Sequence, residues 1–263
     1  MSALTPLADK VAVVTGGNQG IGRAIALEMA RAGAAVVIAA RTYESLDEVR
    51  RELETLGATS LALRCDVADP ASVDAIGDTV LSRFGRVDVV VANAGVAGPT
   101  KPLHEISPQE WRECMATDLD GVYLTFRRFV PAMLERRSGV LIAISSMTGK
   151  RPLLNRTPYA AAKMGVIGLV RTLALELGPY GIRANCVCPG AVEGARIAAV
   201  IRAQGIAQGI SEAEVAKQLT EGAPLQRMVG PQEIASTCVF LASEAAAAIT
   251  GEDVNVSAGL VMY

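Results

Sequence analysis

Two side chains four residues apart form a candidate proton-transfer pair. Tyr159 and Lys163 share one face of a predicted helix, because residues at i and i+4 are neighbours on a helix surface. A phenol is a weak acid at neutral pH, and a fixed ammonium one turn away favours its phenolate form. Tyr159 could then protonate a carbonyl oxygen during reduction, or accept a proton from an alcohol during oxidation. Such pairs are common on helix surfaces, so the surrounding residues decide whether this pair has a catalytic role.

A hydroxyl side chain precedes that helix. Ser146 follows the apolar segment 139–144, which reads as a buried strand, so it would lie at the carboxyl edge of a parallel sheet. There its hydroxyl could hydrogen-bond the substrate oxygen as charge develops on it. The three residues together predict carbonyl and alcohol chemistry. Other residues expected in the substrate pocket are Met147, Leu153 and Asn155.

A glycine-rich loop follows the first predicted strand. It reads Gly16-Gly17-Asn18-Gln19-Gly20-Ile21-Gly22. Gly16 would allow a sharp turn, and Gly20 and Gly22 would let the next helix approach the sheet closely. The N-terminus of that helix would offer free amides and partial positive charge to a pyrophosphate. The spacing differs from the commoner glycine pattern, but its place between strand and helix favours nucleotide binding over a purely structural turn.

The end of the second predicted strand indicates which nicotinamide cofactor binds. An acidic residue there would bind the ribose hydroxyls of NAD, whereas an arginine accommodates the 2′-phosphate of NADP. This strand ends with Arg41 and Thr42 and no carboxylate, and Arg41 could donate two hydrogen bonds to the phosphate. The alternative is a solvated arginine at a strand end, and Gln19 is neutral where many NADP enzymes have a second cation. We expect NADP(H) rather than NAD(H).

Strands and helices alternate along the chain. Short apolar runs predict strands at 11–15, 35–40, 60–65, 87–92, 139–144, 182–187 and 253–256. Helical periodicity predicts helices at 20–32, 43–56, 70–84, 108–136, 158–178 and 231–243. Most of these strands are apolar throughout, as strands buried on both faces are. The pattern predicts an α/β fold: a doubly wound parallel sheet with helices on both faces.

One segment breaks this alternation. Residues 191–222 form a long helical insertion between the sixth strand and the last helix. In a parallel sheet this insertion would lie at the carboxyl edge, where ligands bind. We expect one domain spanning 1–263, with a substrate lid at about 191–222.

Composition excludes several classes of protein. The chain has 263 residues, 51% of them hydrophobic and 20% charged, which suits one large core. The net charge is −2 and no long basic run occurs, so neither nucleic acid nor an anionic membrane is an expected partner. No secretory signal or membrane span of about 18 apolar residues is apparent. Five scattered cysteines suit a reducing cytoplasm.

Several other residues are weaker candidates. Cys186 and Cys188 share a strand face, but without a further Cys or His cluster we expect buried thiols and no metal site. The single histidine, His104, reads as a loop residue. Three cations lie between the serine and the tyrosine, and they could attract an acidic substrate or form a solvated basic loop. These are Lys150, Arg151 and Arg156.

Taken in order, these motifs resemble those of the short-chain dehydrogenase/reductase family. The resemblance rests on the glycine loop, on Ser146 with Tyr159-(x)3-Lys163, and on short motifs at 66–67, 93–95 and 189–190. It covers nearly the whole chain. It implies a seven-stranded Rossmann-type domain that transfers the pro-S hydride of the nicotinamide. It also implies a homotetramer, or a homodimer, built through the helices at 108–136 and 158–178.

The resemblance also implies roles for individual residues. Ser146 would bind the reacting oxygen, Tyr159 would be the acid/base, and Lys163 would also hold the nicotinamide ribose. Asp66 and Val67 would contact the adenine. The remaining implied cofactor contacts are Asn93, Ala94 and Gly95 in the cleft, and Pro189, Gly190 and Val192 behind the nicotinamide.

Two positions depart from the family pattern. Asp118 stands where the family usually has an asparagine that completes a proton relay through bound water. The family holds that water largely by a backbone carbonyl, which aspartate retains, so Asp118 is the expected fourth catalytic residue. A buried carboxylate also needs partners or a proton. Gly194 stands where a threonine usually touches the nicotinamide amide, so we expect the lid to close differently.

These observations predict reversible, NADP(H)-linked reduction of a small ketone or aldehyde. A 3-oxoacyl-[acyl-carrier-protein] reductase is one alternative, although Tyr180 stands where such enzymes usually have a basic residue for docking the carrier. An NAD-dependent alcohol or sugar dehydrogenase is a second. A nucleotide-sensing protein that keeps the fold without the chemistry is a third. The specific substrate does not follow from these residues.

Overall fold

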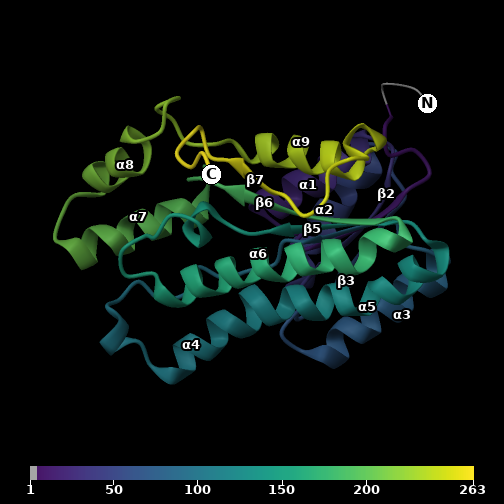
Figure 1. Cartoon of the computed structure of the whole chain (residues 1–263), viewed down its shortest axis with the longest axis horizontal. Coiled ribbons are helices and arrows are strands. Elements are labelled where there is room, and N and C mark those ends of the chain that lie inside the picture. Colours follow the sequence, from purple (N-terminus) through teal and green to yellow (C-terminus); the bar gives the residue numbers. More distant parts are fainter. Residues whose placement is uncertain (1–4) are drawn as a thin grey trace.

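The strands of the computed structural model, which describes residues 5–263, form one parallel sheet (Figure 1). Its order is β3-β2-β1-β4-β5-β6-β7. Every neighbouring pair is parallel, so the fold class predicted above is confirmed. The strands are β1 Val11–Thr15, β2 Ala35–Ala40, β3 Ser60–Arg64, β4 Val89–Ala92, β5 Gly139–Ile144, β6 Ile182–Pro189 and β7 Asp253–Val256.

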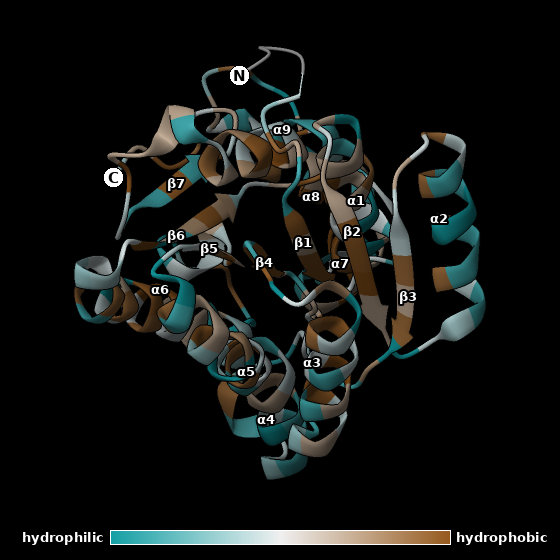
Figure 2. Ribbon diagram, turned by 90° about the vertical axis from the view of Figure 1, so that its right-hand side faces the viewer, coloured by the Kyte–Doolittle hydropathy of each residue, from teal (hydrophilic) through white to brown (hydrophobic). Residues whose placement is uncertain are grey.

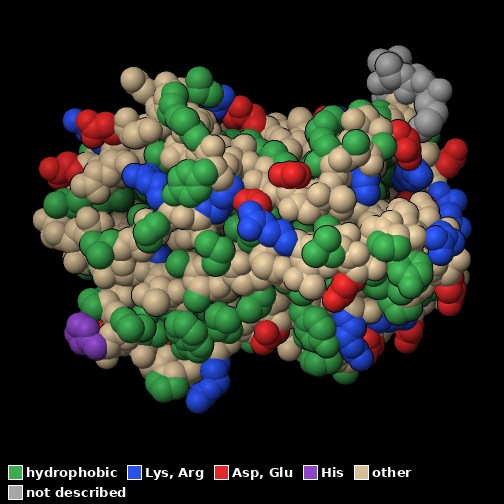
Figure 3. Space-filling view, viewed as in Figure 1, with side chains coloured by type: hydrophobic (Ala, Val, Ile, Leu, Met, Phe, Trp, Pro, Cys, Tyr) green, Lys and Arg blue, Asp and Glu red, His purple; other side chains and the backbone are tan. Residues whose placement is uncertain are grey.

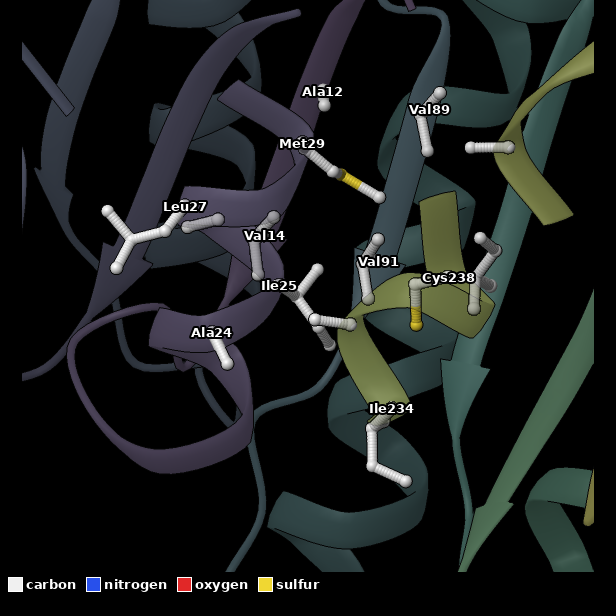
Figure 4. Packing of buried hydrophobic residues seen from close by; sticks show 14 of the residues in the cluster. Ala12, Val14, Ala24, Ile25, Leu27, Met29, Val89, Val91, Ile234 and Cys238 are labelled. Carbon is white, nitrogen blue, oxygen red and sulfur yellow. The ribbon is translucent and has the colours of Figure 1, made fainter. Parts of the chain in front are cut away.

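Helices cover both faces of the sheet (Figure 2). One layer contains α1 Gly20–Arg31, α2 Tyr43–Thr55 and α9 Pro231–Ala242, and the other contains α3 Pro70–Phe84, α4 Pro108–Met115, α5 Gly121–Arg136 and α6 Thr157–Leu177. Successive strand residues point to opposite faces, so Val14 packs into the first layer and Val13 into the second. In the first layer, Ile25 of α1 and Cys238 of α9 face the sheet together (Figure 4).

The helix expected at 108–136 contains a π-helical turn. Residues 108–136 are helical throughout, as expected, but the turn at Ala116–Asp120 separates α4 from α5. Such wide turns insert about one extra residue, and they often occur at functional sites. A regular apolar period runs through both halves, so the sequence does not reveal the insertion. Asp118 lies in this turn and is fully buried.

The segment between β6 and α9 stands outside the two layers (Figure 1). It contains α7 Ala195–Gln208 and α8 Glu212–Glu221, so it is helical as expected, while its role as a lid stays a prediction. Ser211 and Glu214 form a capping box at the start of α8. The segment has a small apolar cluster of its own: Ala191, Ile201, Val215 and Leu219.

No helix between residues 5 and 263 is both long and apolar enough to cross a membrane.

Candidate active site

The end of β5 and the start of α6 are joined by two reciprocal hydrogen bonds. Lys163 Nζ donates to the carbonyl of Ile144 at 3.1 Å, and Ser145 Oγ donates to the carbonyl of Lys163 at 2.7 Å. These bonds hold the helix against the strand that leads into Ser146. Lys163 Nζ lies 5.6 Å from the ring centroid of Tyr159. The three residues with predicted chemistry therefore lie on neighbouring elements at one edge of the sheet.

Ser146 is held in place by the turn that follows it. Its Oγ accepts a hydrogen bond from the amide of Thr148 at 3.1 Å, and only 8% of the residue is exposed. A hydroxyl has one hydrogen to donate and two lone pairs. Because the amide occupies a lone pair, the hydroxyl hydrogen stays free for a substrate oxygen.

Asp118 has the partners that a buried carboxylate needs. Its Oδ1 lies 3.2 Å from Lys163 Nζ and accepts a hydrogen bond from the amide of Val96 at 3.2 Å. Cys114 Sγ donates to Oδ2 at 3.5 Å. Desolvation by itself would lower the pKa of Lys163, but the Asp118 carboxylate, with a smaller effect of Tyr159, outweighs it and raises that pKa. The two side chains form a buried ion pair.

Arg156 lies in the site, although the sequence reasoning named it only as one of three cations in a basic loop. Only 3% of it is exposed, and its Cζ lies 4.8 Å from the centroid of the Tyr159 ring. Its Nη2 donates to the carbonyl of Ala97. Nothing in its local pattern distinguishes it from an exposed loop arginine, so only its contacts place it in the site.

The other two cations of that loop have different surroundings. Lys150 forms a 2.7 Å ion pair with Asp253 of β7, and both side chains are 8% exposed. Its Nζ also donates to Asn255 Oδ1 at 3.1 Å. Arg151 is exposed and borders a cavity beside the lid segment. A solvated basic loop is therefore a correct description of Arg151 only.

The glycine loop follows β1 closely and contacts β4. Gly16 has φ +65°, and a Cβ on Gly22 would lie 2.0 Å from the Gly16 carbonyl oxygen, so α1 can approach only without that side chain. Asn93 Nδ2 donates to the carbonyl of Thr15 at 2.9 Å. Gln19 precedes α1 without capping it through its side chain, so the first amides of α1 remain available. This loop suits a dinucleotide pyrophosphate.

The remaining predicted cofactor residues follow neighbouring strands at the same edge. Arg41 and Thr42 follow β2 and are exposed, and Asp66 and buried Val67 follow β3. Across residues 5–263, no ion-pair partner of Arg41 is seen. Asp66 Oδ1 accepts a hydrogen bond from the amide of Ala68 at 3.0 Å. Half-buried along this edge are Gly16, Asn18, Ile21, Asn93, Ala94, Gly95, Gly190 and Val192, while Pro189 is buried and Gln19 and Gly20 are exposed.

The lid segment reaches back to the cofactor side of the site. Arg196 of α7 donates from Nη2 to the carbonyl of Gly95 at 2.7 Å. Gly194, just before α7, has φ +136°, which side chains other than glycine rarely adopt. A threonine would be strained in this backbone conformation. That the lid closes differently stays a prediction.

A cavity of about 180 Å³ lies between the lid segment and the loop after β5. Of the predicted pocket residues, Met147 and Leu153 line it, whereas Ser146, Asn155 and Tyr159 do not. The other lining residues are Arg151, Pro152, Val200, Gln204, Gln208, Val215, Gln218 and Leu219. Asn155 instead has φ +60°, and its carbonyl accepts a hydrogen bond from the amide of Lys101.

The weaker candidates are two cysteines and the histidine. Cys186 and Cys188 are buried free thiols in β6. His104 is 82% exposed and lies at the edge of the molecule (Figure 3). On the face shown there, positive and negative side chains are mixed rather than gathered into one patch.

Comparison with known proteins agrees with this geometry. The family described as enoyl-(acyl carrier protein) reductase matches residues 16–261. One similar protein is the cis-4-hydroxycyclohexanecarboxylate dehydrogenase of Sinomonas cyclohexanicum, 38% identical over 96% of this chain and 96% of that protein. Another is the granaticin polyketide synthase putative ketoacyl reductase 1 of Streptomyces violaceoruber, 39% identical over 97% of this chain and 94% of that protein.

Solved structures share the fold over almost the whole chain. The structure of NAD+-bound xylitol dehydrogenase has a TM-score of 0.94 at 25% identity, covering 96% of this chain and 99% of that one. A variant of actinorhodin polyketide ketoreductase with NADPH has a TM-score of 0.92 at 36% identity, covering 97% and 98%. Proteins similar to this chain thus bind either nicotinamide cofactor.

Proposed function

The chain belongs to the short-chain dehydrogenase/reductase family, and on that premise we propose that it reduces a small carbonyl compound with NADPH through Ser146, Tyr159 and Lys163. As a family member it is an oxidoreductase that acts on carbonyl and alcohol groups and uses NAD(P)H. The observation that carries the proposal is the pair of bonds between Lys163 and the end of β5. That pair brings the ammonium to 5.6 Å from the Tyr159 ring, next to the strand end that bears Ser146.

The side chains divide the chemistry among them. A bound nicotinamide supplies or accepts the hydride at the substrate carbon. Tyr159 gives its phenolic proton to the carbonyl oxygen during reduction and takes it back during alcohol oxidation. The Ser146 hydroxyl donates to the same oxygen and stabilises the negative charge that develops on it. Lys163 favours the phenolate form of Tyr159 and has a further donor for the nicotinamide ribose.

Asp118 completes the set by holding Lys163. The ion pair fixes the ammonium on the side of the cleft formed by the loop after β4, since the same carboxylate also accepts from the Val96 amide. In this proposal Asp118 orients Lys163 and supports the proton path without giving up a proton itself.

The preference for NADPH depends on Arg41. Its exposed guanidinium, which has no carboxylate beside it, suits the 2′-phosphate, and Thr42 adds a hydroxyl. The related structures contain either NAD+ or NADPH, so this residue supports the choice of cofactor. Abundant NADPH in a cytoplasm would favour the direction of reduction.

Replacement of Tyr159 by phenylalanine tests the proposal. Incubation of the protein with NADPH and a panel of cyclic ketones, aldehydes, sugars and 3-oxoacyl thioesters should give loss of NADPH absorbance with at least one compound. Y159F should lower kcat about a hundredfold or more while NADPH fluorescence still reports binding. The control is Y123F, which changes an exposed tyrosine of α5 and should keep full turnover.

Two outcomes would contradict the proposal. Full turnover by Y159F would show that another group moves the proton. NADPH binding by the wild-type protein without turnover of any compound would favour the nucleotide-sensing alternative.

A second candidate is reduction of a 3-oxoacyl group carried by an acyl carrier protein. The Arg137 guanidinium lies 5.4 Å from the ring centroid of Tyr180, so a cation stands beside the expected docking position although Tyr180 itself is neutral. If this candidate is correct, R137E should raise KM for a 3-oxoacyl carrier protein and leave KM for the same acyl group on a short thioester unchanged. Equal KM values for R137E and wild type with both substrates would exclude it.

We also propose that the chain assembles through α5 and α6 as a homotetramer or homodimer. Large apolar side chains are exposed on these helices: Tyr123, Met164 and Leu175. Met164 and Leu175 lie on one stripe of α6, because eleven residues are close to three helical turns. Other apolar residues of α5 pack into the core: Val122, Leu124, Phe126 and Phe129.

A further inference from the structure

Arg156 is a buried cation in contact with the proposed acid/base. It is 3% exposed, its Cζ lies 4.8 Å from the ring centroid of Tyr159, and its Nη2 donates to Ala97. Its Nε is buried and has no hydrogen-bond partner within residues 5–263. A buried guanidinium with an unmet donor costs stability, so its presence calls for a role in the site.

The other charges beside Tyr159 largely cancel. Lys163 and Asp118 form the buried 3.2 Å ion pair, so the ammonium projects much less positive charge toward the phenol than a free lysine would. Burial, together with the nearby Asp118 carboxylate, raises the pKa of Cys114 to about 12, so its thiol stays neutral. Lys163, Asp118 and Cys114 together therefore present much less positive charge to the ring than a lone lysine would.

Arg196 is a further cation near the site, on the lid segment. It is exposed and donates to the carbonyl of Gly95, so water screens its charge. Arg156 is the remaining charged group near the ring in the described part of the chain, and it has no carboxylate of its own in an ion pair.

We propose that Arg156 is a positioning residue that supplies the positive field favouring the phenolate of Tyr159, because Asp118 neutralises much of the field of Lys163. The inference deepens the proposed function and depends on the acid/base role of Tyr159. Two features of the guanidinium suit it to this task. Burial lowers the pKa of Arg156, but a guanidinium starts from so high a value that it keeps its charge near neutral pH, and it can lie over an aromatic face.

Variants that change the charge of Arg156 or Asp118 test this proposal without a known substrate. The phenolate absorbance of Tyr159 is followed as the pH is raised, and the signal is isolated by subtracting the matching variant that also carries Y159F. R156Q should raise the midpoint of this titration by about one pH unit or more, because an opposite charge is lost. D118N should lower it, because Lys163 is no longer neutralised. The double variant D118N/R156Q should return close to the wild-type midpoint.

These titrations separate an electrostatic role from a structural one. R156K keeps the charge and should keep a midpoint near the wild-type value. Equal midpoints for R156Q and wild type would overturn the proposal. If R156Q folds poorly, the double variant decides, since it loses one negative and one positive charge and so keeps the wild-type net charge around the ring. A midpoint for the double variant as low as that of D118N alone would show that Arg156 does not act on Tyr159.

Kinetics provide a second measurement and a control. In alcohol oxidation with NADP+, R156Q should shift the pH–rate profile to higher pH by the same amount and approach the wild-type rate at alkaline pH. Arg83, whose guanidinium lies 5.5 Å from the Phe84 ring, is the matched control, and R83Q should leave the profile unchanged. If Y159F abolishes turnover and R156Q shifts nothing, only this inference fails; if Y159F stays active, the proposed function fails with it.

Discussion

We propose that cofactor choice in this protein depends on a single side chain at the end of β2. Arg41 is exposed and stands where a carboxylate would otherwise bind the ribose hydroxyls of NAD. A guanidinium adds two charge-assisted hydrogen bonds to a 2′-phosphate and nothing comparable to a 2′-hydroxyl. The difference between the two cofactors should therefore appear when this residue alone is changed.

We predict that R41A raises the Kd for NADPH about tenfold to a hundredfold, because each 1.4 kcal/mol lost is about a factor of ten. The Kd for NADH should change about twofold or less. Cofactor fluorescence titration measures both values, and R31A, at the far end of α1, is the control. Equal losses for the two cofactors would contradict the assignment of NADP(H).

The first helix depends on close contact between backbone segments. α1 begins directly after the glycine loop, and a Cβ at Gly22 would lie 2.0 Å from the Gly16 carbonyl oxygen. Gly20 differs, because a Cβ there would meet nothing within 4 Å and only its φ of +53° favours glycine. Glycine is therefore required at position 22 because a side chain would clash, and favoured at position 20 because of the backbone conformation.

We predict that G22A lowers the free energy of unfolding by about 2–3 kcal/mol and abolishes tight NADPH binding, since α1 must move away from the loop. G20A should cost about 1 kcal/mol through backbone strain alone. Denaturant unfolding and fluorescence titration measure the two effects. A G22A protein as stable as G20A would show that the loop relaxes freely around the added methyl group.

The loop after β5 is anchored by a buried ion pair to β7. Asp253 accepts from Lys150 and, at the surface, from Arg171. Burial alone would raise the pKa of Asp253, but the hydrogen bonds from these two cations outweigh burial and hold that pKa below its usual value. A depressed carboxyl pKa stabilises the fold above the unfolded-state value and ceases to do so as the pH falls through the folded-state value.

We predict that D253N lowers the free energy of unfolding by about 3 kcal/mol between about pH 5 and 8, because Lys150 is left buried without its partner. The difference from wild type should shrink as the pH falls below about 4, where the wild-type carboxyl also becomes protonated. Denaturant unfolding at several pH values measures this trend. D78N, which changes a carboxylate that is 80% exposed, is the control and should cost little. A difference that does not vary with pH would mean that packing, not charge, carries the effect.

At the scale of the whole molecule, α5 and α6 expose apolar side chains that no other element within residues 5–263 covers. Leu175 is 81% exposed and Met164 is 51% exposed on α6, and Tyr123 of α5 is 48% exposed. Hydrophobic side chains are visible along this face of the molecule (Figure 3). Burial of one leucine is worth about 1.5–3 kcal/mol, so a second subunit would gain from covering it.

We predict that the wild-type protein sediments as a dimer or tetramer at micromolar concentration, and that L175D raises the dissociation constant of this interface at least about tenfold. L56D changes an exposed leucine at the end of α2 and should leave assembly unchanged. Analytical ultracentrifugation of the three proteins measures their oligomeric state and the dissociation constant. A monomeric wild type would contradict the proposed assembly.

The amino-acid sequence by itself determined the order of strands and helices, the glycine loop and the Ser146, Tyr159 and Lys163 set. Buried parallel strands are continuous apolar runs, helices repeat every 3.6 residues, and tight turns need glycine. These signals are local, so they can be recognised in the sequence before the fold is known. Once the strands are parallel, all their carboxyl ends meet at one edge, and motifs far apart in the chain become neighbours.

Only the tertiary structure decided what the charged residues between Ser146 and Tyr159 do. Their sequence shows three similar cations, yet Lys150 pairs with Asp253, Arg151 faces water and Arg156 lies over the Tyr159 ring. The partners of Asp118, in the π turn, likewise come from distant elements. The energy of a charge depends on burial and on partners from other segments, and neither can be read from the residues beside it.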